Sequence, residues 1–173
     1  QIATLLAADC IVARCVGRSE FGARALGNRS ILANPANAAN VVHINDAIKS
    51  RDFWMPFCPS ILAEHTNGIL VNPKLIPAPY MTIGYNTDPA WHTRLKAALH
   101  ASDMSARPQF VEQDVNPGYW ALIDAFYQRT GIPAVLNTSL NLHGEPMNYT
   151  VADAVRTMAL SDLGYRMLKF FPA

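Results

Sequence analysis

Apolar positions near the start of the chain predict a helix, a buried strand and a second helix. Residues 2–8 have helical periodicity, and the continuous apolar run from Cys10 to Val16 contains β-branched residues, which favours a strand covered on both faces. A turn follows at Asn34-Pro35. Apolar residues then recur at helical spacing from Ala36 to Lys49, so we predict a helix that ends in basic residues.

The middle of the chain has weaker periodicity and more prolines. The segment from Phe53 to Pro59 holds two prolines and three aromatic residues, so we expect it to be extended and edge-like, with residues 61–63 continuing as a strand. Residues 64–79 read as a loop. The alternation from Tyr80 to Tyr85 predicts a strand, and a short helix follows from Trp91 to Leu99.

The last third of the chain has the clearest helix signal. Asn116-Pro117 begins this helix, and Thr130-Gly131 closes it. The other predicted elements are strands at 109–111 and Ile132–Leu136, a helix at Asp153–Leu160 and a strand at Tyr165–Phe171. Strands that alternate with helices predict an α/β domain, in which ligands gather at the carboxyl ends of strands.

Composition narrows the class of protein. With 173 residues, of which 50% are hydrophobic, we expect a single globular domain over residues 1–173. A net charge of +1 argues against nucleic acid or an acidic membrane as a partner. The three cysteines and five histidines show no metal-type spacing, so we predict no bound metal. The odd cysteine count and the absence of a membrane-spanning run favour a cytoplasmic protein.

Glycines and arginines alternate between residues 17 and 30. The glycines permit unusual backbone conformations, and the arginines supply fixed positive charge suited to phosphate or carboxylate. This pattern indicates an anion site; the less favoured alternative is that the glycines form ordinary turns beside surface charges. A Walker loop is excluded, because Asn28 and Arg29 stand where Lys and Ser/Thr are required. The residues are Gly17, Gly22 and Gly27 with Arg18, Arg24 and Arg29.

Four ordered blocks between residues 17 and 146 carry a resemblance to a known family. They are Glu20-Phe21-Gly22-Ala23-Arg24-Ala25-Leu26-Gly27-Asn28-Arg29-Ser30, residues 49–60 with their Pro-Phe-x-Pro pattern, residues 103–109 ending Arg107-Pro108-Gln109, and residues 130–146 around Asn137-Thr138-Ser139. The sequence resembles the C-terminal domain of O-carbamoyltransferases, the enzymes that carbamoylate nodulation factors and several antibiotics. The order and number of the blocks make the resemblance specific.

The resemblance implies a fold and a reaction. The fold would be YrdC-like: a twisted, open, mixed sheet with flanking helices and a concave, positively charged face. The domain would condense carbamoyl phosphate with ATP to carbamoyladenylate, with Mg²⁺ accompanying ATP and no tightly bound metal. In the family, an N-terminal Kae1-like domain then transfers the carbamoyl group to a hydroxyl. We expect that domain to be absent from this chain and to act as its partner domain or subunit. A homodimer is a further possible assembly.

The resemblance also assigns residues. Arg24, Lys49 and Arg107 match positions that bind the phosphates and the carbamoyl group, and Ser139 matches a serine that contacts the adenylate; we take these four as catalytic. Asn137 is expected to be a donor beside Ser139. The other candidate substrate- and nucleotide-binding residues are Arg18, Glu20, Gly22, Arg29, Arg51, His100, Asp103, Thr138, Asn141 and Glu145.

Several candidates have equally simple structural roles. Glu20 could serve only to orient Arg24 or Arg18, and Asp103 could cap a helix end or loop. Asn141 and Glu145 could stabilise their own turn. An aromatic cluster at Phe53, Trp54 and Phe57 could stack on adenine, but we favour core packing.

The sequence departs from the family pattern at three positions. Ala23 replaces a proline before Arg24, Met104 replaces a glycine, and Met55 replaces an arginine before Pro-Phe-x-Pro. The last change removes a charge-assisted contact worth about 1.5–3 kcal/mol. Three functions therefore compete: a carbamoyladenylate-forming enzyme, a nucleotide-binding partner or regulatory module without turnover, and an RNA-binding module, which the near-neutral charge disfavours.

Overall fold

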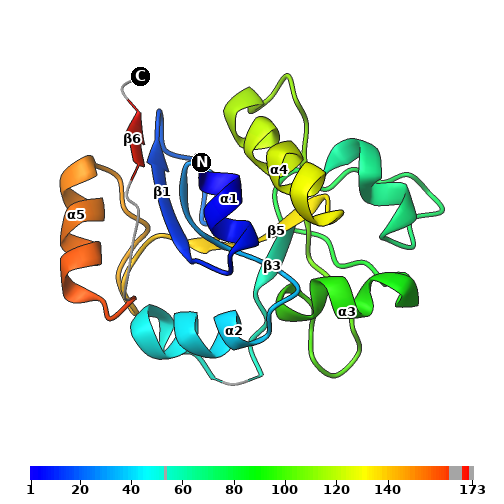
Figure 1. Ribbon diagram of the computed structural model, residues 1–173, viewed down its shortest axis with the longest axis horizontal. Coiled ribbons are helices and arrows are strands. Elements are labelled where there is room, and N and C mark those ends of the chain that lie inside the picture. Colours follow the sequence, from blue (N-terminus) through cyan, green and yellow to red (C-terminus); the bar gives the residue numbers. More distant parts are fainter. Residues whose placement is uncertain (53, 164–168, 172–173) are drawn as a thin grey trace.

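The sheet of the protein is open and mixed, with six strands in the order β4-β3-β5-β2-β1-β6 (Figure 1). The computed structural model describes residues 1–52, 54–163 and 169–171. Strands β1 and β6 are parallel, as are β3 and β4, and the three other pairs are antiparallel. The predicted α/β class and open mixed sheet are thus confirmed. The strands are β1 Val12–Val16, β2 Arg29–Ala33, β3 Cys58–Leu62, β4 Gln109–Val111, β5 Ala134–Ser139 and β6 Lys169–Phe171.

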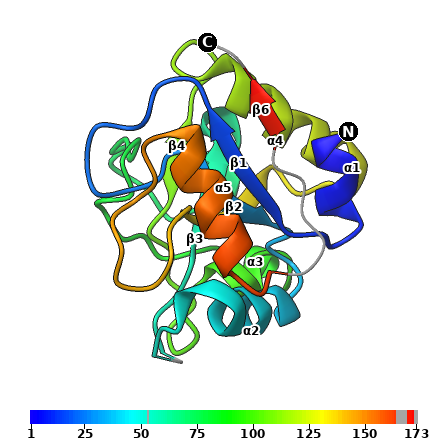
Figure 2. The ribbon, with the colours of Figure 1, turned by 90° about the vertical axis from the view of Figure 1, so that its left-hand side faces the viewer.

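Helices flank the sheet on both faces and bury two apolar clusters. On one face, α1 and α4 pack together and contribute Leu6, Tyr119 and Phe126 to the larger cluster. On the other face, α2 and α5 contribute Ile44 and Met158, and Figure 2 shows α5 lying across β1 and β2. The helices are α1 Ile2–Ala7, α2 Ala39–Ile44 with a π-helical turn at Asn45–Lys49, α3 His92–Leu95 between 3₁₀ turns at Pro89–Trp91 and Lys96–Ala98, α4 Pro117–Thr130 and α5 Val151–Leu160.

Local signals explain why the two longest helices start and stop where they do. The Asn116 side chain accepts a hydrogen bond from the Tyr119 N–H at 3.2 Å, and Gly131 closes α4 in the left-handed conformation at φ 70°. Thr150 Oγ1 accepts from the Asp153 N–H at 3.1 Å, while the Asp153 carboxylate accepts from the Thr150 N–H at 2.7 Å. This capping box begins α5 two residues before the predicted start.

Three element predictions were wrong. Residues 29–33 form strand β2, which was not predicted, so the glycine-rich stretch joins two antiparallel strands. The predicted strand at Tyr80–Tyr85 is absent, because Met81 has a left-handed φ of 54° and only Tyr85 makes an isolated bridge, to Ala106.

The predicted edge-like segment ends in an interior strand instead, because β3 lies between β4 and β5. Pro59 is tolerated in this interior strand. Because the Leu62 N–H donates toward β5, the backbone nitrogen of residue 59 faces the β4 side, and β4 pairs with β3 only from Ser60 onward.

Residues Ala63–Gly68 form a 3₁₀ helix, although residue 63 was predicted as strand and the rest as loop. Strands β1 and β5 each begin two residues later than predicted, and the predicted helices agree with the structure. The helices expected over 2–8, Ala36–Lys49 and Trp91–Leu99 correspond to α1, to α2 with its π-helical turn, and to α3 with its 3₁₀ turns. Phe53 and residues 164–168 lie outside the described residues, and β6 confirms the end of the last predicted strand. Across the part of the chain that the structure describes, no helix is both long and apolar enough to cross a bilayer.

Candidate functional site

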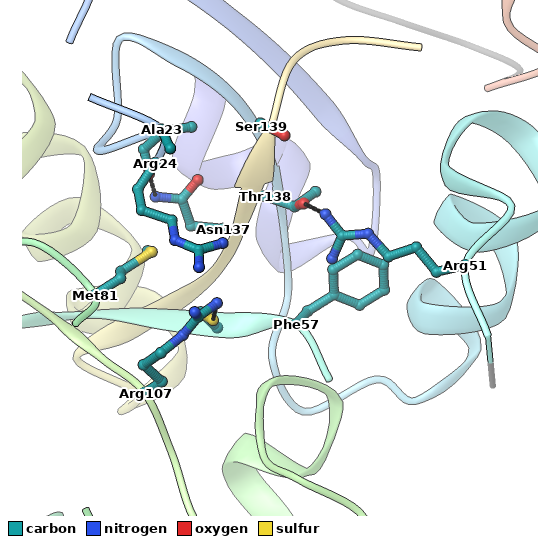
Figure 3. Close-up of a pocket in the computed structure, with 11 residues that line it drawn as sticks. Ala23, Arg24, Arg51, Phe57, Met81, Arg107, Asn137, Thr138 and Ser139 are labelled. Atoms are coloured by element: carbon teal, nitrogen blue, oxygen red, sulfur yellow. Dashed lines mark hydrogen bonds between the residues drawn. The ribbon is translucent and has the colours of Figure 1, made fainter. Parts of the chain in front are cut away.

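Three arginines from separate parts of the chain converge on one cleft (Figure 3). Arg24 comes from the glycine-rich stretch, Arg51 follows the π-helical turn, and Arg107 lies just before β4. The cleft has a deep part of about 50 Å³, which ends at residues 137–139 of β5, and a wider mouth of about 540 Å³. All three arginines line both parts, and no aspartate or glutamate does among the described residues.

Arg51 and Arg107 are held by contacts that do not neutralise their charge. Arg51 Nη2 donates to Thr138 Oγ1 at 3.3 Å, and Arg51 Cζ lies 5.3 Å from the centroid of the Phe57 ring. Arg107 Nη2 lies 3.3 Å from Cys58 Sγ. Burial lowers the pKa of Arg51, Cys58 opposes this shift, and the neighbouring guanidinium groups lower the pKa further. Because arginine stays charged in proteins, an anion in the cleft would relieve this repulsion.

Glu20 organises the glycine-rich stretch from within. Its Oε1 accepts from the N–H groups of Leu26 and Asn28, both at 2.7 Å, and from that of Arg29 at 3.2 Å. The partners in these bonds are backbone groups and not the side chains of Arg24 or Arg18. The predicted role of Glu20 in orienting those arginines therefore does not match these contacts. The carboxylate instead holds the backbone of the turn that leads into β2.

Arg29 is a structural residue in the same stretch. Its side chain is 6% exposed and donates to the carbonyl oxygens of Val16, Gly17, Asn28 and Tyr149 at 2.9–3.1 Å. These bonds tie β1 and β2 to the segment before α5. The exposed residues Arg18 and Gly22 do not line the cleft.

Asn137, Thr138 and Ser139 form the inner wall of the cleft. We predicted that these residues follow the end of the strand, but they form the last part of β5 itself. Asn137 is 2% exposed, and its Nδ2 donates to Ala25 O at 3.1 Å and to Ser60 Oγ at 2.9 Å. These bonds join β5 to β3 and to the segment that carries Arg24.

Lys49 lies behind Ser139 and does not line the cleft. Its side chain is 2% exposed, and its Nζ donates to Ser139 Oγ at 3.1 Å, Ser139 O at 2.5 Å and Asn141 Oδ1 at 2.8 Å. Burial, with a smaller contribution from Arg51, lowers the pKa of Lys49 to about 7. Lys49 therefore contacts the site only indirectly, by its hydrogen bonds to Ser139.

The other candidates divide between the mouth of the cleft and local turns. His100 lines the mouth, with Nδ1 at 3.0 Å from Ser102 Oγ. Asp103 accepts from the Ser105 N–H at 2.9 Å, and this bond lowers its pKa, which agrees with the loop-capping alternative.

The turn after β5 explains two more candidates. Asn141 Nδ2 donates to Glu145 O at 2.8 Å, and the Glu145 carboxylate takes two hydrogen bonds from Arg156 at 2.7 and 2.8 Å. This ion pair lowers the pKa of Glu145. Asn141 thus stabilises its own turn, as the structural alternative predicted, whereas the Glu145 side chain joins the turn to α5 through Arg156.

Sequence reasoning missed part of the cleft lining. Phe57 and Cys58 were visible only as members of the Pro-Phe-x-Pro block, and Met81 gave no signal because its segment was predicted as a strand. Phe57 is 4% exposed, as core packing predicted, but Trp54 is 55% exposed and lines the mouth, so that prediction was wrong for Trp54. The other missed lining residues are Ala23, Ala25, Pro56, Gly84, Ser105 and Ala106.

Comparison with known proteins identifies the family of this chain. The family described as "Carbamoyltransferase C-terminus" matches residues 3–171. This chain belongs to that family. Nodulation protein NolNO of Sinorhizobium fredii is 42% identical over 164 residues, which cover 94% of this chain and 24% of the relative. Nodulation protein NolO of Bradyrhizobium diazoefficiens is 41% identical over 159 residues, covering 91% and 29%.

A third relative has a lower sequence identity to this chain. Nodulation protein U of Rhizobium tropici is 36% identical over 144 residues, covering 83% of this chain and 24% of the relative. The chain thus spans about a quarter of the length of these relatives. No group of three or more histidine, cysteine or acidic side chains that could hold a metal ion occurs among the described residues of the carbamoyltransferase domain.

Proposed function

We propose that this carbamoyltransferase domain forms carbamoyladenylate from carbamoyl phosphate and ATP. The observation that carries the proposal is the convergence of Arg24, Arg51 and Arg107 on a cleft without a lining carboxylate. Carbamoyl phosphate and the triphosphate of ATP are both polyanions, and each needs cations to come close to the other. Mg²⁺ would accompany ATP and share this task.

The reaction sets a clear physical demand. Water converts carbamoyl phosphate into carbamate and phosphate. A carbamate oxygen then bonds to the α-phosphorus of ATP while the bond from that phosphorus to pyrophosphate breaks, so negative charge develops on the oxygen that leaves phosphorus. Fixed guanidinium groups stabilise such charge without reorganising at the moment of reaction. They also hold two reactants in place, which lowers the entropic barrier. The residues that would do this are those in the deep part of the cleft, where Figure 3 shows Arg24 and Arg107 near Asn137.

The size of the cleft agrees with two ligands of different size. The deep part, at about 50 Å³, matches a small group, whereas the mouth, at about 540 Å³, has room for a nucleotide. Trp54 and His100 line the mouth and offer ring faces to a base. We place the carbamoyl group at the inner wall and ATP in the mouth.

Calorimetry with three separate ligands tests the proposal. We expect ATP with Mg²⁺ and carbamoyl phosphate each to bind the chain, and a short RNA to give no heat. Binding of RNA alone would overturn the proposal in favour of an RNA-binding module. Binding of neither small ligand would remove the basis for placing them in this cleft.

Met55 supports a second function, that of a nucleotide-binding partner without turnover. It is 40% exposed and lines the mouth beside the three arginines, at the position where the family has a fourth. A chain that binds ATP but shows no reaction with carbamoyl phosphate would have this function. In either case, we propose that a Kae1-like domain or subunit completes the transfer to an acceptor.

A further inference from the structure

The hydrogen-bonding state of Ser139 follows from the atoms around it. Ser139 Oγ lies 2.5 Å from Asn141 Oδ1, and two oxygens so close must share a hydrogen. The Asn141 oxygen carries none, because its amide nitrogen is identified by donation to Leu142 O at 2.9 Å and Glu145 O at 2.8 Å. The hydroxyl hydrogen of Ser139 is therefore directed at Asn141.

Lys49 limits the hydrogen bonds that the Ser139 hydroxyl can form with a ligand in the cleft. The ammonium of Lys49 donates to Ser139 Oγ at 3.1 Å and so occupies one lone pair. A hydroxyl has one donor and two acceptor positions. With its hydrogen and one lone pair in use, Ser139 can offer the cleft only an acceptor.

Asn137 also lines the deep part of the cleft and carries a second acceptor, its amide oxygen. Its Nδ2 donates to Ala25 O, Ser60 Oγ and Gln109 Oε1 at 2.9–3.4 Å, which fixes the amide orientation. Its Oδ1 is buried and has no hydrogen-bond partner among the described residues. A buried acceptor without a partner costs free energy, which a donor on a ligand would recover.

These acceptors contrast with the rest of the cleft, where three arginines provide donors only. Phosphate and carbonyl oxygens match the arginines, but they cannot donate to Ser139 or Asn137. We infer that Ser139, with Asn137, accepts hydrogen bonds from the amino group of the carbamoyl moiety and thereby selects carbamoyl phosphate over acyl phosphates that lack an N–H. This specificity role rests on the proposed function.

Binding of carbamoyl phosphate and acetyl phosphate to the full chain tests the inference. The two ligands share the phosphate and carbonyl groups, and a methyl group replaces the amino group in acetyl phosphate. We expect acetyl phosphate to bind at least about tenfold more weakly, because each acceptor left unpaired at the site weakens binding. Equal dissociation constants for the two ligands would overturn the inference while leaving the proposed function intact.

Two variants sharpen the test. Ser139→Ala should reduce the discrimination between the two ligands severalfold, and its fold should survive because Lys49 keeps its bond to Asn141 at 2.8 Å. Ser139→Thr retains the hydroxyl and should retain the discrimination. An unchanged ratio in Ser139→Ala would contradict the role of Ser139. A wild-type chain that binds neither ligand would overturn the proposed function, and this inference with it.

Discussion

Arg107 has a direct test at the residue scale. It is half-buried and contacts Cys58 through Nη2, so its removal should cost little stability. We predict that Arg107→Ala lowers carbamoyladenylate formation by about 10²–10³-fold, as the loss of a charge-stabilising donor does. The thermal transition, followed by circular dichroism, should be nearly unchanged.

The matched control for Arg107 is Arg94→Ala. Arg94 lies with Cζ 5.2 Å from the centroid of the Trp91 ring, away from the cleft, and should not affect the rate. An Arg107→Ala variant that unfolds would show instead that Arg107 is structural.

Met55 belongs to the same scale, because a single substitution there would add a charge at the mouth of the cleft. It is 40% exposed at the mouth, so an arginine there would reach solvent and the cleft. We predict that Met55→Arg lowers KM for carbamoyl phosphate at least about tenfold, equivalent to ~1.4 kcal/mol, with little change for ATP. The gain should shrink at high salt.

Met55→Gln is the neutral control for this prediction and should leave KM as it is. If KM for carbamoyl phosphate stays unmoved in Met55→Arg, position 55 does not contribute to the phosphate site.

At the scale of elements, the glycine-rich stretch packs closely against α4 at Gly27. A Cβ on Gly27 would lie 2.4 Å from Tyr119 Cδ1, and the φ of Gly27 is 115°. We predict that Gly27→Ala lowers the free energy of unfolding by at least about 1–3 kcal/mol, because Tyr119 is fully buried and must move. Urea denaturation measures this.

Gly22 provides the comparison for Gly27. Its φ is 127°, but nothing lies within 4 Å of an added Cβ. Gly22→Ala should therefore carry backbone strain alone and destabilise the protein less. Equal losses in the two variants would mean that the contact with Tyr119 does not matter.

The π-helical turn and the end of β5 are joined by Lys49, and this link predicts a pH dependence. Burial lowers the pKa of Lys49 from 10.5 to about 7. Below pH 7 the side chain is protonated in both the folded and unfolded states. Between pH 7 and 10.5 the unfolded state holds a proton that the folded state has lost, so stability rises with pH.

Lys49→Met isolates this contribution. We predict that the unfolding free energy of the wild type, relative to that of Lys49→Met, rises by up to about 1.4 kcal/mol per pH unit between pH 7 and 10. Chemical denaturation of both proteins across this range measures it. A difference that stays constant with pH would contradict the lowered pKa.

Elements with local start and stop signals could be predicted, and those shaped by distant contacts could not. Asn116 and Gly131 bound α4 in the sequence as they do in the structure. Strand β2 was missed because its five residues begin with the polar Arg29 and Ser30, which leaves a short apolar run, and because its partner β5 is remote in sequence. The segment at Tyr80–Tyr85 alternates like a strand, but Met81 adopts a left-handed conformation that alternation cannot reveal.

At the scale of the whole molecule, the cleft forms because separate segments meet at the end of β5. The glycine and arginine pattern predicted an anion site, the resemblance added Arg107 and Ser139, and these two residues line one cleft with Arg24. Sequence could not distinguish Arg24 from Arg29, since both follow the glycine pattern, and only the fold buries Arg29 against backbone carbonyls. The catalytic roles of these residues stay predictions.

The matched region covers about a quarter of the relatives, and the proposed function assigns the acceptor step to a Kae1-like domain or subunit. We predict that the 173-residue chain alone activates the carbamoyl group but carbamoylates no hydroxyl compound. Mass spectrometry of candidate acceptors incubated with the chain, ATP and carbamoyl phosphate would detect a transfer product. Transfer by the chain alone would show that the activating and transferring sites coincide.

Pyrophosphate exchange tests the central claim most directly. If the arginine cleft forms carbamoyladenylate reversibly, labelled pyrophosphate should enter ATP only when carbamoyl phosphate and Mg²⁺ are both present. We predict this dependent exchange for the wild-type chain and its loss in Arg107→Ala. Exchange that is absent from the wild type at millimolar substrates, while ATP still binds, would contradict the claim and leave a nucleotide-binding module.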